Sequence, residues 1–210
     1  MSAASNNIAD IESRVNAVEA VALGKGLIKP GHLDKFAHTV EEDWTPAAGA
    51  AIVARAWVDE AFKARLLQDG IAAISELGFS MPVHHRNLVV LENAAQLHNV
   101  ICCTLCSCTA FTIIGMPPDW YKDLEYRARV VRESRTVLRE MGLDLPKSVE
   151  IRVWDTTADT RYMVLPYRPP ETEGWSEEEL AAIVSKEALI GTVRVELDAA
   201  FLASREKRAG

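Results

Sequence analysis

Residues 97–108, LHNVICCTLCSC, run from a predicted strand directly into a cluster of cysteines. The first six of these residues and the preceding segment Asn87–Asn93 carry the branched apolar side chains typical of strands, with a short polar turn between them. All four cysteines of the chain lie between positions 102 and 108. Such a cluster cannot form disulfides between distant parts of the chain, so a disulfide-framed secreted domain is excluded.

On either side of these strands, the periodicity of apolar residues predicts more helices and two further strands. Helices are predicted at about 8–22, after Pro30, and at 47–57, 59–77, 121–141 and 176–190, and strands at 149–154 and 161–165. Gly70 is a candidate break within 59–77, and Ser176 with Glu179 predicts a capping box at the start of the last helix. Helices followed by strands and then by helices again predict an α+β fold with a mostly antiparallel sheet.

The composition describes an acidic globular chain. It has 210 residues, 49% of them hydrophobic, and a net charge of −7, enough for one core with an appendage. The acidic balance argues against nucleic acid as a partner. With no signal-peptide start and no apolar run long enough for a membrane, we expect a cytoplasmic protein. Two amphipathic helices in the first 45 residues need a surface to pack against, on this chain or on another.

Three kinds of site could use the cysteine cluster. A structural zinc site usually takes two Cys-x2-Cys pairs, and this chain offers one, although His98 could complete a set of four ligands. A redox Cys-x-x-Cys pair usually begins a helix, whereas Ser107, Cys108 and two nearby prolines predict a loop.

The third possibility is a claw around a trivalent ion. The sulfurs of Cys106 and Cys108 and the amide nitrogens of Ser107 and Cys108 can lie in one plane, with Cys103 as an axial ligand. Deprotonated amides favour a low-spin ion such as Co(III) or Fe(III), whose open sixth position could activate water or a substrate. Spacing alone leaves the three kinds of site open. Strand alternation directs Cys102 away from Cys103, as a small buried apolar residue.

The segment Cys103–Cys108 resembles the metal motif of nitrile hydratase alpha subunits. The resemblance continues in order through GMPPDWYK (115–122), YRARVVR (126–132), IRVWD (151–155), RYMVLP (161–166), GWSEEEL (174–180) and LIG (189–191). It therefore covers most of the chain. The gamma subunit of thiocyanate hydrolase shares the motif and a similar C-terminal half.

This resemblance implies a layered α-β-β-α domain that hydrates nitriles to primary amides. We accordingly assign residues 1–45 to a helical arm that embraces a beta-type subunit, 46–195 to the metal-binding domain and 196–210 to a tail. An activator or metallochaperone is a further expected partner. Thr104 matches the cobalt-type motif, so Co(III) is expected, with Fe(III) as the alternative.

The resemblance also assigns roles to individual residues. Cys103 would be the axial thiolate, Cys106 a sulfinic acid and Cys108 a sulfenic acid, with peptide nitrogens from Ser107 and Cys108 completing the protein ligands. The oxidised sulfur of Cys108 is a candidate nucleophile.

Two further residues match a conserved arginine and acid beside the centre. They are Arg161 and Asp159, and Asp159 is one methylene shorter than the usual Glu. A plain ion pair at a strand end is the alternative for these two. Asp155 is expected to hold the surroundings of the centre together, while arginines of the beta subunit would complete the active site.

The residues after the last cysteine depart from the family. Relatives continue with Tyr-Pro-Trp-Pro, and this chain has TAFT at 109–112. We therefore predict a wider, more polar pocket for a bulky or heteroaromatic nitrile, for example toyocamycin. Its lining is predicted to include Thr109, Phe111, Thr112, Ile114 and His84.

Several alternatives remain beside these assignments. His84 or His85 could replace a glutamine of the relatives, or they could lie in a solvated turn. His98 could orient the metal loop or simply pack. The arginines of the segment 126–132 are expected to form a solvated or interface face. As a whole, the chain could instead be a thiocyanate hydrolase gamma-type subunit, although residues 109–112 lack the usual Pro and Arg, or a non-catalytic cobalt-carrying subunit.

Overall fold

The computed structural model describes residues 3–197, 199 and 201–203. Contacts divide the chain into two compact units, Met1–Asp43 and Trp44–Gly210. This division lies close to the predicted boundary between arm and domain at residue 45. The predicted tail, 196–210, falls largely outside the described residues.

The N-terminal unit consists of two helices and a π-helical turn. They are α1 (Ala3–Gly24), α2 (His32–His38) and the turn η1 (Thr39–Asp43). Gly26 and Gly31 both take a positive φ between the helices, a conformation that only glycine adopts without strain. Both helices therefore form where the sequence predicts them.

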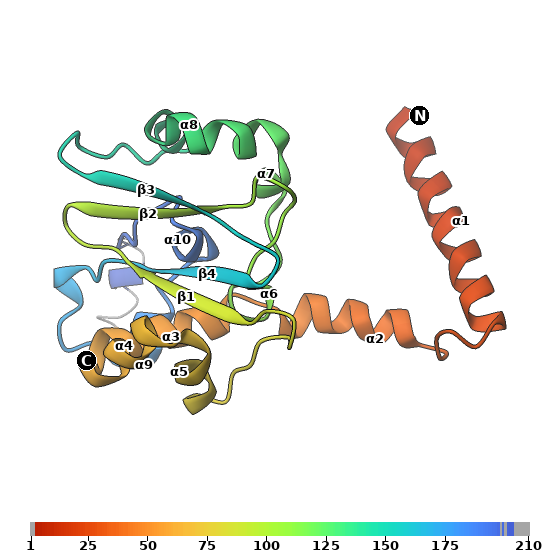
Figure 1. The fold of residues 1–210 in the computed structure, drawn as a ribbon, viewed down its shortest axis with the longest axis horizontal. Coiled ribbons are helices and arrows are strands. Elements are labelled where there is room, and N and C mark those ends of the chain that lie inside the picture. Colours follow the sequence, from red (N-terminus) through yellow and green to blue (C-terminus); the bar gives the residue numbers. More distant parts are fainter. Residues whose placement is uncertain (1–2, 198, 200, 204–210) are drawn as a thin grey trace. The chain divides into compact units, whose positions relative to one another are not determined.

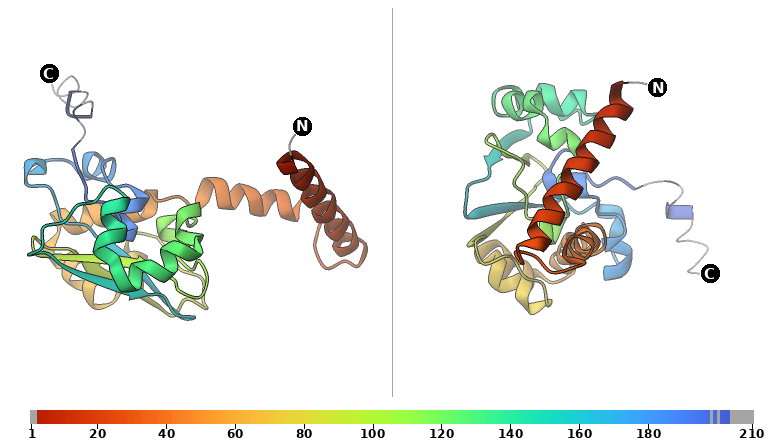
Figure 2. Two further views of the ribbon diagram at one scale, coloured as in Figure 1. Left: turned by 90° about the horizontal axis from the view of Figure 1, so that it is seen from above. Right: turned by 90° about the vertical axis from the view of Figure 1, so that its right-hand side faces the viewer.

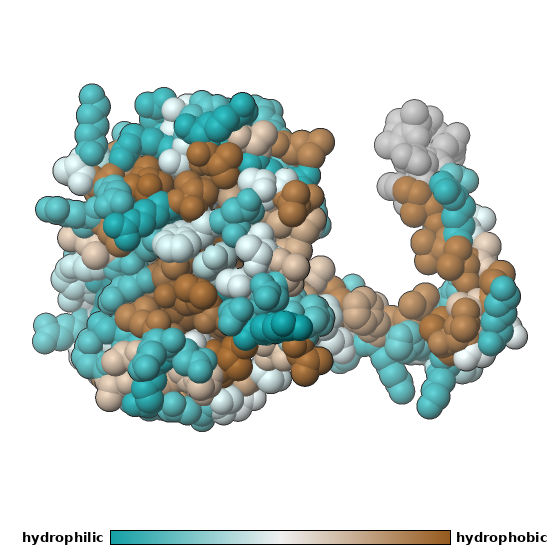
Figure 3. Space-filling view, viewed as in Figure 1, coloured by the Kyte–Doolittle hydropathy of each residue, from teal (hydrophilic) through white to brown (hydrophobic). Residues whose placement is uncertain are grey.

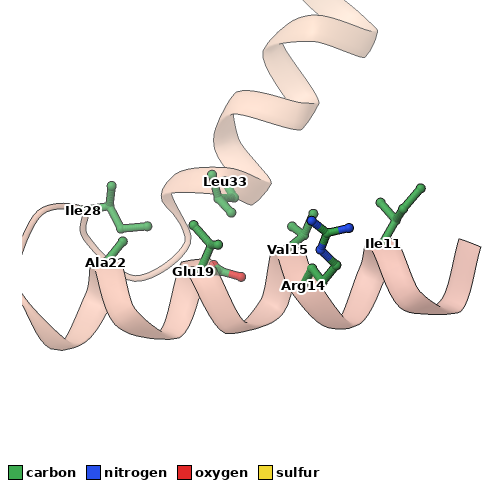
Figure 4. A pocket seen from close by; sticks show the side chains of 8 residues that line it. Ile11, Arg14, Val15, Glu19, Ala22, Ile28 and Leu33 are labelled. Carbon is green, nitrogen blue, oxygen red and sulfur yellow. The ribbon is translucent and has the colours of Figure 1, made fainter.

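An apolar groove of about 520 Å³ runs along this unit. Figure 4 shows Ile11, Val15 and Ala22 on the same side of α1, the side on which Ile28 and Leu33 also lie. In the space-filling view of Figure 3, brown apolar side chains lie along both helices. The amphipathic faces predicted for the first 45 residues are therefore present and remain open within the unit.

The C-terminal unit contains short helices around four strands (Figure 1). The helices are α3 (Ala47–Val58), α4 (Glu60–Gln68), α5 (Gly70–Glu76), α6 (Phe111–Ile114), α7 (Asp119–Lys122), α8 (Leu124–Glu140), α9 (Glu177–Ala181) and α10 (Lys186–Ile190), with a 3-10 turn at Pro170–Thr172. The strands are β1 (Asn87–Glu92), β2 (Leu97–Cys102), β3 (Glu150–Asp155) and β4 (Thr160–Leu165).

The mixed helix and strand composition is confirmed, but the antiparallel pairing is wrong. β1 pairs in parallel with β4, from Asn87↔Thr160 onward, and β2 pairs in parallel with β3. β1 and β2 do not pair with each other as a hairpin. Side chains instead hold the turn between them: Asn99 N–H donates to Asn93 Oδ1 at 2.7 Å, and Asn99 Nδ2 donates to the Glu92 carbonyl at 2.9 Å. The partner strands arrive after a helical crossover, which favours parallel pairing.

The elements of this unit are stacked in order. Figure 1 shows α8, then the β2–β3 pair, then the β1–β4 pair, and then α3–α5 with α9; the right-hand view of Figure 2 shows α8 and α5 on opposite sides of the strands. Contacts follow this order, since α8 packs on β3, β2 on β4, and α4 and α5 on β1. The largest fully buried side chains of the core are Tyr121, Phe62, Ile52, Leu66, Ile74, Ile101, Ile113, Ile114, Leu138, Met163, Leu165 and Leu180.

Two predicted helices are each divided by a capping residue. The stretch 59–77 breaks before Gly70, where Asp69 accepts the N–H of Ala72 and caps α5. The stretch 176–190 breaks into α9 and α10, because Ser185 caps the second helix while the predicted capping box of Ser176 begins the first. The first break lies at Gly70, where the sequence indicates a candidate break, whereas helical periodicity continues across Ser185 and predicts a single helix there.

Candidate metal centre

The cysteine loop begins immediately after β2 and gathers three sulfur atoms. The Sγ atoms of Cys103, Cys106 and Cys108 all lie within 4.8 Å of one another. Cys103 Sγ is 3.3 Å from Cys106 Sγ, which is 2.8 Å from Cys108 Sγ. None of the four cysteines forms a disulfide bond. Three soft donors at this separation could hold a single metal ion.

The end of β3 fixes the first half of the loop. Asp155, which is opposite Cys102 in the strand register, accepts the Thr104 N–H at 2.9 Å and also the Thr104 hydroxyl. The next residue, Thr156, donates its N–H to the Cys102 carbonyl at 3.0 Å. Asp155 thus has the structural role expected from sequence, and Thr104 is oriented by both of its donors.

The second half of the loop is held through its carbonyl groups, which accept hydrogen bonds from side chains of other elements. Arg127 Nη1 donates to the Cys106 carbonyl at 2.9 Å, and the Tyr121 hydroxyl donates to the Cys108 carbonyl at 3.2 Å. The Thr156 hydroxyl donates to the same Cys108 carbonyl at 3.4 Å. The sequence alone predicts a solvated or interface face for Arg127. Only the packing of α7 and α8 reveals that these side chains reach the cysteine loop.

The thiols of Cys103 and Cys108 differ in pKa because their hydrogen bonds and burial differ. Burial raises the pKa of Cys103, but hydrogen bonds from Thr156, from the Cys108 and Cys106 backbone and from the Cys106 side chain outweigh it and lower that pKa to about 7. Burial raises the pKa of Cys108 to about 12, with added effects of Cys106 and Cys103. A bound cation would favour the thiolate at each sulfur, which is the form that binds metal.

Arg161 lies beside this cluster at the start of β4. The residue is 5% exposed, and its guanidinium donates to the carbonyls of Thr157 and Thr160. Its positive charge acts to lower the pKa of Cys108 and also that of His85. Arg161 Nε is buried and lacks a hydrogen-bond partner in the part of the chain that the structure describes. A buried guanidinium with an unused donor is therefore available next to Cys108.

Asp159 does not pair with Arg161. Its Oδ1 accepts the hydroxyls of Thr157 at 3.1 Å and Thr160 at 3.4 Å. No ion pair joins the two residues among the described side chains, so the strand-end ion pair is not formed. Asp159 instead stabilises the turn whose carbonyls hold Arg161.

The residues predicted to line a pocket fall into two groups. Phe111 is half-buried, with its ring 4.5 Å from Trp44 and 5.3 Å from His85 between ring centroids, while His84 is exposed. Thr112 is half-buried and donates its hydroxyl to the Ser80 carbonyl at 3.1 Å.

The second group is buried. Thr109 is 2% exposed and donates to the Gly115 carbonyl at 3.5 Å. Ile114 is 1% exposed within the hydrophobic core. The structure therefore gives Thr109 and Ile114 packing roles and leaves Phe111, Thr112 and His84 closer to the surface.

Three remaining residues, His85, His98 and Cys102, are buried. His85 is 3% exposed, so it does not lie in a solvated turn, and burial lowers its pKa to about 4, with further lowering by Arg161 and His84. His98 bonds the Gly191 carbonyl through Nε2 at 2.8 Å, which identifies it as a packing histidine. Burial raises the pKa of Cys102 to about 12, as expected for a residue outside the ligand set.

The fold and the site define a mixed α and β protein with a cysteine-rich loop able to hold a metal ion. The sequence profile of "Nitrile hydratase, alpha chain" matches residues 9–193. The low-molecular-weight cobalt-containing nitrile hydratase subunit alpha of Rhodococcus rhodochrous is 47% identical, over 87% of each chain. Thiocyanate hydrolase subunit gamma of Thiobacillus thioparus is 39% identical, over 88% of this chain and 79% of the relative.

A solved structure agrees with these relatives. A double histidine variant of the Fe-type nitrile hydratase from Comamonas testosteroni Ni1 superposes with a TM-score of 0.87 at 57% identity, over 92% of this chain and 93% of that one. This chain therefore belongs to the nitrile hydratase alpha-chain family. None of the helices over the described residues combines the length and apolar character needed to cross a lipid bilayer.

Proposed function

We propose that this chain is the metal-bearing subunit of a nitrile hydratase and converts a nitrile to its primary amide with a beta-type partner. The observation that carries the proposal is the convergence of the Cys103, Cys106 and Cys108 sulfurs within 4.8 Å, in a chain of the nitrile hydratase alpha family.

The donor set suits a trivalent ion. Three sulfurs and the peptide nitrogens of Ser107 and Cys108 would hold it, with cobalt favoured by Thr104 and by the cobalt-containing relative. Iron is the alternative, because the Fe-type structure has the higher identity of 57%. When bound, such an ion acts as a Lewis acid toward a nitrile or water.

Oxidation of two of the ligands is part of the proposal. Cys106 would carry a sulfinic acid and Cys108 a sulfenic acid, both with negative oxygens. Arg161 lies where its guanidinium acts on Cys108, and its unused Nε–H can donate to an oxygen there. Asp159 supports Arg161 through the turn at Thr157 and Thr160. The oxidised sulfur of Cys108 is the proposed nucleophile.

A partner chain would complete this centre. The open apolar groove of α1 and α2 gives the N-terminal unit a surface that a beta-type subunit can cover. We infer that this subunit also supplies the remaining cations around the oxidised cysteines. A metal-delivering activator remains a further expected partner.

The proposed substrate is a bulky or heteroaromatic nitrile such as toyocamycin. Support comes from the TAFT segment at 109–112 and from the aromatic group formed by Trp44, Phe111, His84 and His85. Such rings offer faces on which a heteroaromatic substrate can stack. Hydration rates of acetonitrile and of toyocamycin test this point; faster acetonitrile hydration at equal concentration would refute it.

The function itself is tested with the chain expressed alone and with a beta-type subunit, in cobalt or iron medium. We expect about one equivalent of cobalt per chain, nitrile hydration by the complex, and oxygen added at Cys106 and Cys108 in tandem mass spectra. Cys102 lies in the same peptide and serves as the unmodified internal control. Bound zinc with four unmodified thiols would reject the proposal.

The same preparations separate the alternatives. Thiocyanate turnover without nitrile turnover would assign the chain to the thiocyanate hydrolase type, to which the 39% identical relative belongs. If the complex with the beta-type subunit is inactive and the chain gives up its cobalt when mixed with another subunit, the chain is a non-catalytic cobalt carrier. Equal loading by iron and cobalt in the two media, with activity only in the iron form, would overturn the choice of cobalt.

A further inference from the structure

Arg127 projects from the first part of α8 toward the cysteine loop. Asp123 caps this helix by accepting the Glu125 N–H at 2.7 Å, and the buried Tyr126 donates its hydroxyl to the Ile101 carbonyl at 3.1 Å. These two contacts fix the position of the helix beside β2. The next residue, Arg127, then reaches the Cys106 carbonyl with Nη1 at 2.9 Å, while its Nε is buried and unpartnered within the described part of the chain.

The contact matters because the accepting carbonyl belongs to a peptide whose nitrogen is a proposed metal ligand. The Cys106 carbonyl and the Ser107 nitrogen belong to the same peptide group, and resonance joins the nitrogen to the oxygen across the planar bond. When the nitrogen loses its proton, part of the negative charge therefore resides on the oxygen. A guanidinium hydrogen-bonded to this oxygen stabilises that charge, as in other charge-assisted hydrogen bonds.

We propose that Arg127 is a positioning residue of the metal centre, which orients the Cys106–Ser107 peptide and balances its charge when the Ser107 nitrogen binds a metal. This inference rests on the proposed function. The Ser107 N–H proton passes to a solvent base, and the electron pair left on the nitrogen forms the bond to the metal. No oxidant or reductant is required at this step.

The neighbouring arginines of α8 do not share this arrangement. Arg129 forms ion pairs with Glu125, Glu133 and Glu140. Arg132 is exposed and donates to the Ala128 carbonyl of its own helix at 3.0 Å. Arg127 is thus distinguished by its contact with the loop, and Arg132 provides a control of equal charge on the same helix.

Two metal ions that prefer different ligands, Ni²⁺ and Zn²⁺, test the inference in the full-length reduced chain. Ni²⁺ in a square-planar site binds peptide nitrogens together with sulfurs and then shows a ligand-field absorption band, whereas Zn²⁺ can be held by thiolates alone. Affinities for both ions are measured against a competing chelator for wild type, Arg127→Met, Arg127→Lys and Arg132→Met. Thermal unfolding confirms that each variant is folded.

We expect Arg127→Met to weaken Ni²⁺ binding about 10- to 100-fold, the range for a lost hydrogen bond to a charged group, and to change Zn²⁺ binding by less than about threefold. Arg127→Lys should recover part of the Ni²⁺ affinity, because it restores the charge without the planar fork. Arg132→Met should resemble wild type for both ions.

Two results would overturn the inference while leaving the claw intact. One is unchanged Ni²⁺ affinity and absorption in Arg127→Met; the other is an equal loss of Ni²⁺ and Zn²⁺ affinity, which would make Arg127 a general support of the loop. A wild-type chain that binds Ni²⁺ without the square-planar band at any pH would instead contradict the peptide-nitrogen ligation of the proposed function, and the inference with it.

Discussion

The N-terminal unit and the cysteine loop differ in how their exposed chemical groups are stabilised. The N-terminal helices leave large apolar side chains in water, with Val18 69% and Phe36 53% exposed. The cysteine loop instead has its carbonyls and its Thr104 donors bonded by Asp155, Tyr121 and Arg127 from the same chain. The loop is therefore preorganised by its own fold, whereas the helices need another surface to bury their apolar face.

The largest expected effect comes from removing sulfurs. Substituting Ala for Cys103, Cys106 or Cys108 should abolish binding of cobalt, since two remaining sulfurs cannot complete the site. Cys102→Ala should retain the metal and lose only packing at a fully buried position. Cobalt content after purification measures both effects, and equal metal loss in Cys102→Ala would place the ligands differently.

A smaller effect is expected from the loop's support at β3. Asp155→Ala removes the acceptor of both Thr104 donors and should weaken metal affinity about 10- to 100-fold, as for other residues that orient ligands. Asp144→Ala, at an exposed position, controls for the lost charge. Competition with a chelator gives both affinities. Full affinity in Asp155→Ala would show that the loop organises itself without β3.

A substitution in the apolar groove of the N-terminal unit should weaken binding of the partner without changing the stability of the C-terminal unit. Val18→Glu places a charge in the apolar groove and should weaken association with a beta-type subunit at least about tenfold. Ser13→Glu adds the same charge to α1 at an exposed position away from the groove residues. Calorimetric titration with the partner compares the two variants.

The chain offers a convenient control for that comparison. All five tryptophans lie at position 44 or beyond, so their fluorescence reports only the C-terminal unit. Its free energy of unfolding should change by less than about 0.5 kcal/mol in both variants, as for most surface substitutions. Equal partner affinities for the two variants would remove the groove from the interface.

The smallest effect concerns pH. The pKa of His85 is lowered to about 4 by burial, so the unfolded chain takes up a proton below about pH 6.5 that the folded chain does not bind. Stability should therefore fall as the pH is lowered from about 6.5 to about 4, and this contribution should be constant above that window.

Substitution of His85 tests this dependence. In His85→Gln the fall in stability between pH 7 and pH 5 should be smaller, while His84→Gln, at an exposed position, should resemble wild type. Urea unfolding of the metal-free chain, followed by tryptophan fluorescence, gives the comparison. An identical pH profile in His85→Gln would mean that His85 is protonated in the folded state.

Sequence patterns predicted most local features of this protein. The positions of the strands, the helix capped by Ser176, the burial of Cys102 and the closeness of the other three cysteines all follow from periodicity, capping residues and spacing over a few positions. Gly70 also indicates the break between α4 and α5, but local patterns did not reveal the break at Ser185, because apolar periodicity continues through it.

Tertiary structure decided which distant segments meet. The sequence by itself determined that three cysteines of one short loop can share a metal ion, since covalent geometry keeps residues 103–108 together. Only the fold decided that β1 pairs with β4, that Asp155 orients Thr104 and that Arg127 reaches the Cys106 carbonyl, which lies 21 positions earlier. These contacts depend on the crossover segment that contains α8. Local sequence patterns do not determine which strand the chain lies beside after such a crossover.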